Sequence, residues 1–532
     1  MATQRKAADI LREIAAIAQL ERGKLCPMRS PSGRIHYNLQ YWSGGRNRCE
    51  YVAARDLESV RKAVANYHRY RQLVEAYAGA LERETRRQRG EEGAEKKKLR
   101  EELAQAACRE IDTVLGRHLG PGATLAGAET DLRAALGRIG VQILRAVMQS
   151  EADRADAERP RPRGMIRQGR RPIWVRCLWG DFRIRRAYYT AKSGGRGSAP
   201  AEQRLGIWQS YTPAMARVLS KLAAQLPFAG AAAILQETTG ARVNARQFHR
   251  LTAQAGSAAR RWLDAQKPAG EQAGILYVSF DGVAVPMRKR HLRGRRGRGP
   301  GGTPKTREIR LGCAFTQTSC DRRGKPVRDP DSTTYLAALC SSRDFGHKMR
   351  AEARRRGLAA GRRVVVISDG AKWCEKLAAL RFPGRVHILD FYHAAEHVRE
   401  LSSALLGEGK PSILRFKAWR RTLYRGKAPE LIAEAESLLG QAVDRGAAER
   451  EIRYLRHNLE RMRYAHFRRQ GLFIGSGVVE AGCKTVVAQR TKLSGMLWGR
   501  KGLEDLLTLR CLLLSRRIDS FWGDALTPRR AG

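Results

Sequence analysis

The sequence predicts an α/β core built on a five-stranded mixed sheet with a helical insertion, preceded by mainly helical N-terminal regions. Short apolar runs bounded by turn residues recur between residues 274 and 390, as expected of buried strands. Helical patterns separate the later runs, which is typical of parallel strands joined by crossover helices. Elsewhere, apolar residues recur every three or four positions, the spacing of amphipathic helices.

The charge balance points to a polyanionic partner. The chain has 532 residues, which suggests two to four domains, and its 42% of hydrophobic residues are enough for packed cores. Its 101 Lys and Arg exceed its 52 Asp and Glu, giving a net charge of +49. So large an excess repels itself unless a polyanion neutralises it. Nucleic acid is the favoured partner, with an anionic membrane or the ribosome as alternatives.

Cysteine use and hydropathy favour a cytoplasmic protein. The ten cysteines are scattered without a CxxC pair, which indicates reduced thiols rather than a disulfide framework or a zinc ribbon. The first residues lead into an amphipathic helix and do not resemble a signal peptide. No run approaches the roughly 18 apolar residues of a membrane span. We therefore expect no membrane partner.

Residues 1–75 are expected to combine a helix with a hairpin. Residues 1–22 place apolar side chains at helical spacing, namely Ile10, Leu11, Ile14, Ile17 and Leu20. Residues 34–53 alternate around Trp42-Ser43-Gly44-Gly45, which indicates a hairpin turn. A helix with a break is expected from about residue 55 to about residue 115. The helical region 76–150 mixes charges of both signs over 82–102, as in a solvated helix or a dimerising coiled coil.

Residues 151–205 are expected to form a linker and a small module. Residues 151–172 are polar, basic and contain prolines, which predicts a linker. Residues 173–205 predict a strand-rich module, with two strands around Trp179-Gly180-Asp181.

Residues 206–265 predict a helical domain with the outline of a helix-turn-helix. A helix over 228–237 and a turn precede Asn244, a residue suited to cap the next helix at 245–255. This second helix would offer Arg246, Gln247 and Arg250 to a DNA groove. Many helical hairpins look alike, so a packing role is the alternative.

From residue 274 onward the pattern changes to strands. Strands are predicted at 275–285, 307–318, 332–341, 363–368 and 386–389, with helices at 346–360 and 371–380. This is the element order of the ribonuclease H-like fold, in which the first strand lies parallel beside the fourth. The core would comprise 270–393 and 471–515, with a helical insertion at 394–470 and a tail at 516–532.

Three acidic residues could meet in this core. Asp281 and Asp369 each follow an apolar run and precede a glycine, so neighbouring strands would bring them within about 5 Å in sheet spacing. Glu480 would enter a later helix capped by Ser476, although the helix dipole alone favours a first-turn glutamate. Three carboxylates suit two Mg²⁺ ions, because Mg²⁺ prefers oxygen ligands and keeps waters. The alternative is that both aspartates only begin turns.

Cationic residues near these acids suggest a path for phosphates. Lys484, Arg490 and Lys492 follow Glu480. The segment 286–310 holds ten Lys or Arg and one acid in a glycine-rich loop that includes Arg293, Arg295, Arg296 and Arg298. Residues 450–469 interleave arginines with aromatic residues, which suits backbone contact and base stacking.

Four sequence blocks resemble the DDE transposases of bacterial insertion sequences, most closely the ISKra group, which is related to Mutator-like transposases. The blocks are Val278-Ser279-Phe280-Asp281-Gly282, Ile367-Ser368-Asp369-Gly370, Leu389-Asp390-Phe391-Tyr392-His393 and Gly477-Val478-Val479-Glu480-Ala481-Gly482-Cys483-Lys484. The resemblance is strong over roughly 274–515 and weaker over 165–256. It departs from the family after Tyr188-Tyr189, where relatives often carry a CxxC knuckle, so no zinc is expected.

The resemblance implies a triad of Asp281, Asp369 and Glu480 that binds two Mg²⁺, for which Mn²⁺ can substitute. It also implies that Asp390 and His393 match an Asp-x-x-His signature and support the site. The implied partners are double-stranded DNA, as element ends and target, and further copies of the chain in a homodimer or larger homo-oligomer. The implied location is the bacterial cytoplasm, on the nucleoid when DNA is bound.

The expected activity is DNA transposition, in which Mg²⁺-dependent cleavage at terminal repeats precedes strand transfer. A structure-specific nuclease or resolvase on the same fold is one alternative. A domesticated, non-catalytic DNA-binding protein is another, although three carboxylates facing phosphate argue against it. The run His393-Ala394-Ala395-Glu396-His397 also matches inverted zinc peptidases, but a peptidase has no need of the +49 charge.

Overall fold

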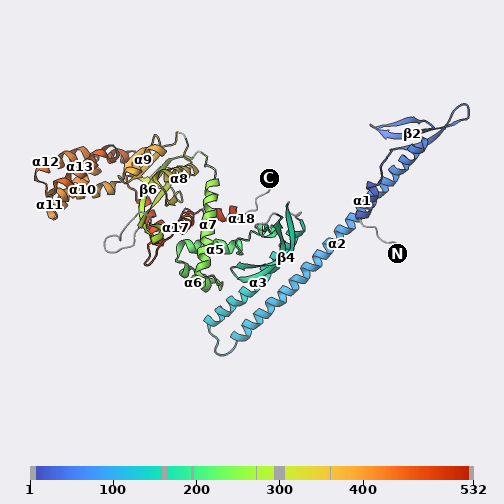
Figure 1. Cartoon of the computed structure of the whole chain (residues 1–532), viewed down its shortest axis with the longest axis horizontal. Helices are drawn as coiled ribbons and strands as arrows, with labels where there is room; N and C mark the ends of the chain where they lie inside the picture. The colour runs from blue at the N-terminus through green and yellow to red at the C-terminus, as the bar shows by residue number, and fades with distance from the viewer. Residues whose placement is uncertain are drawn as a thin grey trace. The chain divides into compact units, whose positions relative to one another are not determined.

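The computed structural model describes residues 7–158, 164–192, 197–270, 272–292, 306–359 and 361–526, apart from the side chains of 87–92, 95 and 525–526. It divides into two compact units, Met1–Leu119 and Gly120–Gly532 (Figure 1). Each unit has its own apolar clusters. No helix among these residues is both long enough and apolar enough to cross a bilayer. Four arginines predicted to contact DNA lie outside the described residues: Arg293, Arg295, Arg296 and Arg298.

The first unit carries a three-stranded antiparallel sheet. Its strands are β1 (Lys24–Arg29), β2 (Ile35–Ser43) and β3 (Arg46–Val52), paired in that order. Gly44 and Gly45 both adopt positive φ in the β2–β3 turn, so the predicted hairpin is confirmed. The sequence pattern does not predict β1, because its side chains are all half-buried or exposed and show no regular alternation.

Two helices complete the first unit. α1 (Ala7–Ala15) packs along α2 (Leu57–His118), with Ile10 buried against Leu73 and Ala80. The helix predicted over 1–22 ends at Ala15, so Leu20 lies beyond it, and Leu11 and Leu20 are 49% and 42% exposed. The predicted break in the second helix is also wrong, since α2 runs unbroken for 62 residues. Pairs of opposite charge four residues apart, such as Glu82 and Arg86, support a solvated helix of this kind.

The second unit begins with a helix packed on a two-stranded ribbon. α3 (Leu125–Glu158) covers β4 (Met165–Cys177) and β5 (Gly180–Ala191), which pair antiparallel as predicted around Trp179. The linker predicted at 151–172 is wrong for most of its length, because α3 continues to Glu158 and β4 starts at Met165. Ala152 and Ala155 are fully buried in the contact with the ribbon, and these small residues carry little hydrophobic signal in a charged stretch.

A helical module follows and is completed from the end of the chain. Its own helices are α5 (Pro213–Gln225), α6 (Phe228–Thr239) and α7 (Ala245–Ala265). The predicted cap is confirmed, because the Asn244 side chain accepts a hydrogen bond from the Gln247 backbone amide at 2.9 Å. The Gln247 side chain in turn accepts one from the Asn244 backbone amide. α17 (Arg500–Leu514) and α18 (Ile518–Leu526) share this core.

The C-terminal residues are structural rather than a tail. Phe521 and Trp522 of α18 are each 1% exposed in the core of the helical module, so the tail predicted from residue 516 is wrong. α17 also crosses α7 so closely that a Cβ at Gly256 would lie 2.4 Å from the Asp505 carbonyl oxygen. Because α17 also contributes Leu503 to the core under the sheet, it ties the helical module to the α/β core.

A five-stranded mixed sheet forms the centre of the second unit, in the order β10-β7-β6-β11-β12. Its strands are β6 (Ile275–Pro286), β7 (Thr306–Gln317), β10 (Thr334–Ala338), β11 (Val364–Ser368) and β12 (Val386–Leu389). β6 pairs antiparallel with β7 and parallel with β11, and β12 continues the parallel half. The five predicted strands and the pairing of the first with the fourth are therefore confirmed.

Helices cover both faces of this sheet, as in an α/β core. On β6, Tyr277 joins the apolar cluster that includes helices α10 and α17, whereas Val278 and Phe280 join the opposite cluster. That opposite cluster is closed by α8 (Ser342–Arg355) and α9 (Lys372–Arg381). Alternate side chains of β6 therefore point into two different apolar clusters. Because both faces of the strand are buried, its sequence is a continuous apolar run.

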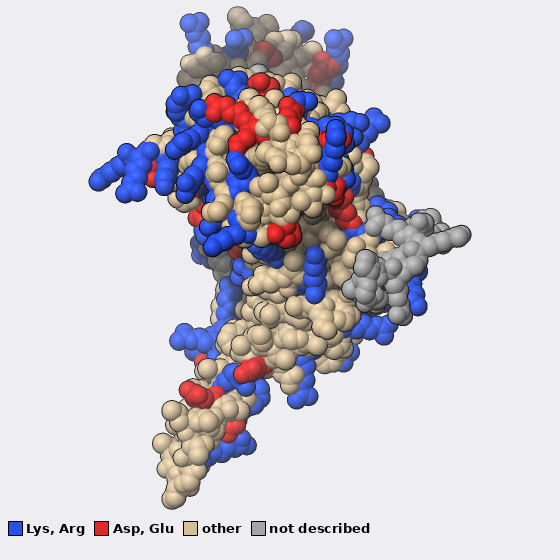
Figure 2. Space-filling view, turned by 90° about the vertical axis from the view of Figure 1, so that its left-hand side faces the viewer, with Lys and Arg blue, Asp and Glu red and all other residues tan. Residues whose placement is uncertain are grey.

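The predicted helical insertion is confirmed as a bundle after β12. It comprises α10 (Phe391–Leu406), α11 (Lys410–Tyr424), α12 (Ala428–Ser437), α13 (Arg445–His457) and α14 (Tyr464–Arg469). Buried Trp419, Leu431 and Leu455 lie in its core. Figure 2 looks at the end of the unit that carries this bundle and shows Lys and Arg side chains gathered along one side.

Candidate active site

The pairing of β6 with β11 brings Asp281 and Asp369 to the same level of the sheet. Phe280 and Ser368 are partners in the parallel register, and an aspartate follows each of them. β11 ends there, whereas β6 continues along β7 with Asp281 opposite Leu311. Both carboxylates are half-buried. Asp281 accepts from the Gly282 amide at 2.6 Å, and Asp369 accepts from the Ala371 amide at 3.2 Å.

Glu480 reaches this region from α15 (Gly477–Gly482). Gly482 packs so tightly that a Cβ would meet the Tyr335 ring at 2.7 Å and the Leu311 side chain at 3.0 Å. Since Leu311 is the register partner of Asp281, this close approach holds α15 beside that carboxylate. The helix then widens into a π-helical turn, Cys483–Ala488, a geometry frequent at functional sites.

Ser476 orients Glu480 instead of capping the helix backbone. It occupies the N-cap position of α15, but its side chain accepts no hydrogen bond from a helix amide, so the prediction that it caps the helix is wrong. Its hydroxyl donates to Glu480 Oε1 at 2.7 Å. Ser476 is only 7% exposed, which shields this bond from water.

The charges of Asp369 and Glu480 act on Asp281. The pKa of Asp281 is raised, first by burial and also by the negative charges of Asp369 and Glu480. Hydrogen bonds from the Gly282 amide and the Cys483 thiol oppose this shift of the pKa. Burial and the two neighbouring charges therefore disfavour the ionised form of Asp281, a cost that a bound cation would relieve.

Two thiols, the buried Cys374 and the half-buried Cys483, flank the aspartates, and neither was predicted from the sequence. The Cys483 thiol donates to Asp281 Oδ2 at 3.3 Å. Burial and the neighbouring aspartates raise the pKa values of Cys483, beside Asp281, and of Cys374, beside Asp369. Both thiols therefore stay protonated at neutral pH and serve as hydrogen-bond donors, not as thiolate ligands.

The spacing of the triad argues against a single shared ion. Among the described residues, the group whose metal-binding atoms all lie within 4.8 Å of one another is His397, Glu400 and Glu451. Asp281, Asp369 and Glu480 are not in such a group, so at least one pair of them is farther apart. Ligands of one Mg²⁺ lie at most about 4.2 Å apart, twice the metal–oxygen distance. Two ions roughly 4 Å apart accommodate a wider set of acids.

Asp390 links two elements of the site from a buried position. It is 1% exposed, caps α10 by accepting from the His393 amide at 2.7 Å, and also accepts from the Ser476 amide. Asp390 thereby fixes the residue whose hydroxyl binds Glu480. The His393 side chain does not bond Asp390, and its ring lies 4.9 Å from that of His397.

The zinc-peptidase pattern gains no support from this geometry. His397 Nδ1 lies 2.6 Å from Glu451 of α13, and its ring stacks on Tyr454 at 3.7 Å. The metal-competent group around His397 omits His393, whose Nδ1 lies 3.5 Å from the exposed Glu396. The two histidines of the motif therefore do not share an acidic cluster.

Tyr454 and Glu308 are further residues beside the aspartates. A Cβ at Gly370 would meet the Tyr454 hydroxyl at 2.0 Å, and that buried hydroxyl has no hydrogen-bond partner among the described residues. Burial and the charge of Asp369 raise the pKa of Tyr454. A Cβ at Gly282 would meet Glu308 at 2.3 Å, so this acid lies across the residue after Asp281. In the sequence, Tyr454 and Glu308 stand in arginine-rich segments, so the prediction for those segments was contact with DNA and not a place beside the aspartates.

The predicted cationic contacts have different fates. Four of them are exposed: Arg246, Arg250, Lys484 and Lys492. The side-chain oxygen of Gln247 instead accepts a hydrogen bond from the Asn244 backbone amide in the capping box. Arg490 is 1% exposed, donates to the Ala223 carbonyl at 3.2 Å and lies over the rings of Phe228 and Trp498. Its side chain therefore supports the helical module from the wall of the pocket described next, and its predicted contact with DNA stays a prediction.

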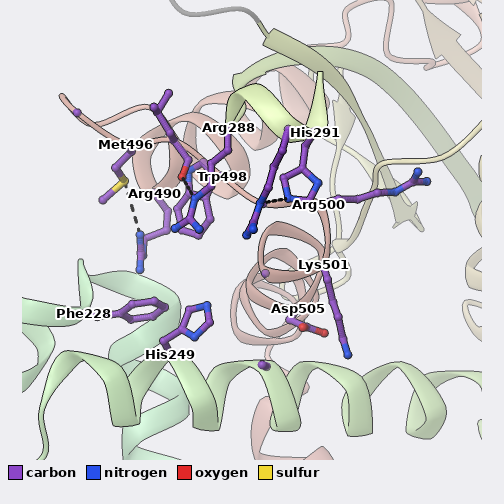
Figure 3. Close-up of a pocket in the computed structure, with 16 residues that line it drawn as sticks. Phe228, His249, Arg288, His291, Arg490, Met496, Trp498, Arg500, Lys501 and Asp505 are labelled. Carbon is purple, nitrogen blue, oxygen red and sulfur yellow. Dashed lines mark hydrogen bonds between the residues drawn. The ribbon is translucent and has the colours of Figure 1, made fainter. Parts of the chain in front are cut away.

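A basic pocket lies between the helical module and the core (Figure 3). It encloses about 600 Å³, and its cationic lining includes Arg288, Arg290, Arg500 and Lys501 beside His249 and His291. Trp498 builds one wall, because its carbonyl accepts from the Arg288 amide at 2.9 Å. The pocket is thus lined by residues that follow the end of β6 and by His249 of α7, the helix that also carries Arg246 and Arg250.

Comparisons with known proteins yield weak likenesses. No protein-family model matches the chain. The chain is 23% identical over 342 residues to the "UPF0236 protein in vanSb 3'region" of Streptococcus gallolyticus, a match covering 63% of this chain and 71% of that protein. A chain of the "Drosophila P element transposase strand transfer complex" is 10% identical, with 60% of this chain and 81% of that chain covered and a TM-score of 0.22. So low a TM-score carries no argument, and the streptococcal name states no activity.

Proposed function

We propose that this chain is a DNA transposase of the DDE type on a ribonuclease H-like core. The observation that carries the proposal is the meeting of Asp281 and Asp369 at one level of the sheet, with the charge of Glu480 acting on Asp281. The fold assignment is supported by the strand order β10-β7-β6-β11-β12, in which only β7 runs against its neighbours. Kinship with the ISKra group is part of this proposal.

The residues present fit a pair of Mg²⁺ ions. Asp281, Asp369 and Glu480 supply only oxygen ligands, and their ligand atoms do not all gather within the reach of one ion. Burial, with the charges of Asp369 and Glu480, raises the pKa of Asp281, and a bound cation would offset that cost. When bound, two such ions activate a nucleophile and stabilise the leaving oxygen in phosphodiester cleavage. Ser476 keeps the Glu480 carboxylate oriented, and Asp390 keeps Ser476 in place.

The exposed cations define where duplex DNA would lie. Arg246 and Arg250 line a pocket at the start of α7 that shares His249 and Ala253 with the pocket of Figure 3, so the two sets of cations adjoin. Lys484 and Lys492 follow the triad glutamate and are exposed. With a net charge of +49, each contact with a phosphate gains from counterion release, so binding should weaken steeply with salt.

The test is a cleavage and strand-transfer assay with Mg²⁺, the full chain and duplex DNA from the borders of its own gene. We expect specific end cleavage and joining to a second duplex, both lost in Glu480→Gln and kept in Glu430→Gln, which changes an exposed glutamate paired with Lys427. Cleavage of branched DNA without joining would instead favour a nuclease or resolvase. Tight binding with no cleavage by any form would favour a non-catalytic DNA-binding protein.

A further inference from the structure

A second cleft lies between the helical bundle and the segment that leads into Glu480. Its lining residues near α15 come before that glutamate in the chain, whereas those of the basic pocket come after it. Its volume is about 1090 Å³, and it is lined by α11, by Phe391 and Tyr392 at the start of α10, by Arg468 of α14, by the turn at 323–326 and by residues 472–475 and 477. We call it the basic–aromatic groove. It uses none of the residues that line the pocket of Figure 3.

The groove is strongly cationic. Seven of its lining residues are Lys or Arg, and none of its lining residues, all of which are described, is acidic. Lys417, Arg420 and Arg421 come from successive turns of α11, and Arg425 follows its end. So many cations at one place repel one another, and a chain of phosphates is the complementary ligand.

Aromatic rings lie among these cations. Tyr392 and Tyr424 are 59% and 43% exposed, although tyrosine rings usually bury most of their surface. The Arg468 guanidinium lies 3.6 Å from the centre of the Tyr424 ring, and Arg420 lies over Phe391 at 5.7 Å. Exposed rings beside arginines form the platforms on which unpaired bases stack. A duplex offers no free base faces, so this surface favours a single strand.

The groove leads to the candidate active site. Gly475 and Gly477 line it and flank Ser476, the residue whose hydroxyl binds Glu480. A Cβ at Gly475 would meet the Tyr392 ring at 3.1 Å and Asp390 Oδ2 at 3.7 Å, so the ring lies directly against this loop, and a side chain here would push it away by a few tenths of an ångström. A strand seated on Tyr392 would therefore lie beside the residues that position the triad glutamate.

We propose that the basic–aromatic groove binds unpaired, single-stranded DNA next to the cleavage site, with phosphates on the α11 cations and bases on Tyr392 and Tyr424. This inference rests on the proposed function and names a substrate feature of the same site: the DNA end is held with its strands separated. An acidic peptide would use the cations but not the exposed rings.

The test is equilibrium binding of fluorescent oligonucleotides to the full chain in EDTA, so that no cleavage occurs. A 20-base single strand, a 20-base-pair duplex and the duplex with a five-base single-stranded tail are compared. We expect Tyr392→Ala and Tyr424→Ala each to weaken binding of the single strand and the tailed duplex about tenfold, the cost of losing one stacked base, with the blunt duplex little changed. Tyr392→Phe keeps the ring and should bind like the wild type.

A charge variant provides an independent arm. Arg421→Ala should weaken single-strand binding and reduce its salt dependence, whereas Arg445→Ala, which removes an exposed arginine of α13 outside the groove, should not. Circular dichroism checks that each variant folds. Equal losses for blunt duplex and single strand, or displacement of the single strand by poly-glutamate at matched charge, would overturn the proposal. Because binding is read in EDTA, loss of cleavage in Glu480→Gln leaves this result unaffected.

Discussion

The Cys483 thiol donates a hydrogen bond to Asp281 Oδ2 across 3.3 Å and thereby joins the π-helical turn to the central strand of the sheet. The two residues are 202 positions apart in the chain. The bond stabilises the ionised form of a carboxylate whose pKa is raised by burial and by two neighbouring acids. Cys483 thus belongs to the site without being a plausible metal ligand.

Replacing Cys483 should change the pH dependence of cleavage. In the proposed mechanism Asp281 acts in its ionised form, so the rate should fall as the pH drops through the pKa of this group. Loss of the thiol donor in Cys483→Ala raises that pKa further, so the acid limb of the pH–rate profile should move to higher pH. Cys483→Ser keeps a donor and should restore the limb toward its wild-type position. Profiles of the Ala and Ser variants that both match the wild type would contradict the role of the bond.

Ser476 should act on the rate through Glu480. Ser476→Ala removes the hydroxyl that binds Glu480 Oε1 but leaves the backbone amide that Asp390 accepts. We expect kcat for cleavage to fall by about 10- to 100-fold with KM for DNA nearly unchanged, the usual cost of losing an outer partner of a metal ligand. Ser476→Thr retains the hydroxyl and should recover most of the rate. A fall in DNA affinity with kcat intact would assign Ser476 to binding instead.

The sheet could be predicted from the sequence because it is buried on both faces. The apolar run of β11, for example, is limited by turn residues at both ends, and the aspartate after it marks the strand end. The linker assigned to 151–172 failed for the opposite reason. Its buried face consists of alanines such as Ala152 and Ala155, which leave no hydrophobic period among charged neighbours.

The positions of the site acids could be predicted, but not their partners. Asp281 and Asp369 follow from the strand pattern, since a parallel register places equivalent residues side by side. The thiol on Asp281 depends on the π-helical turn, and the phenol beside Asp369 depends on how α13 packs. Arg490 shows the same limit, because a buried arginine bound to a carbonyl reads in sequence like an exposed one.

Asp281→Asn should stabilise the protein in the absence of metal. The folded pKa of Asp281 lies above its ordinary value, so ionisation destabilises the fold as the pH rises from the unfolded value of about 3.9 through the folded one. At neutral pH in EDTA, the Asn variant should therefore have the higher Tm, and the difference should vanish below about pH 3. Mg²⁺ or Mn²⁺ should raise the Tm of the wild type more than that of the variant.

The same variant separates metal binding from DNA binding. Cleavage by Asp281→Asn should fall by more than about 100-fold, a larger loss than the one expected for a residue that only supports a metal ligand. Its affinity for duplex DNA in EDTA should stay at the wild-type level or slightly above it. Glu430→Gln, which changes an exposed pair on α12, should match the wild type in Tm, metal response and cleavage. Equal metal-induced gains in Tm for wild type and Asp281→Asn would remove Asp281 from the metal site.

Two tyrosine-to-phenylalanine changes should have opposite effects on stability. The Tyr454 hydroxyl is buried without a partner among the described residues, so its removal in Tyr454→Phe should stabilise the fold by about 1 kcal/mol. The Tyr464 hydroxyl donates to the Leu389 carbonyl at 3.1 Å, and Tyr464→Phe should cost about 1 kcal/mol. Both rings are retained, so urea unfolding compares hydroxyl groups alone.

If Tyr454 serves the substrate beside Asp369, its variant should be more stable yet cleave about tenfold more slowly. A stabilised variant with full activity would show that the hydroxyl has no part in the reaction.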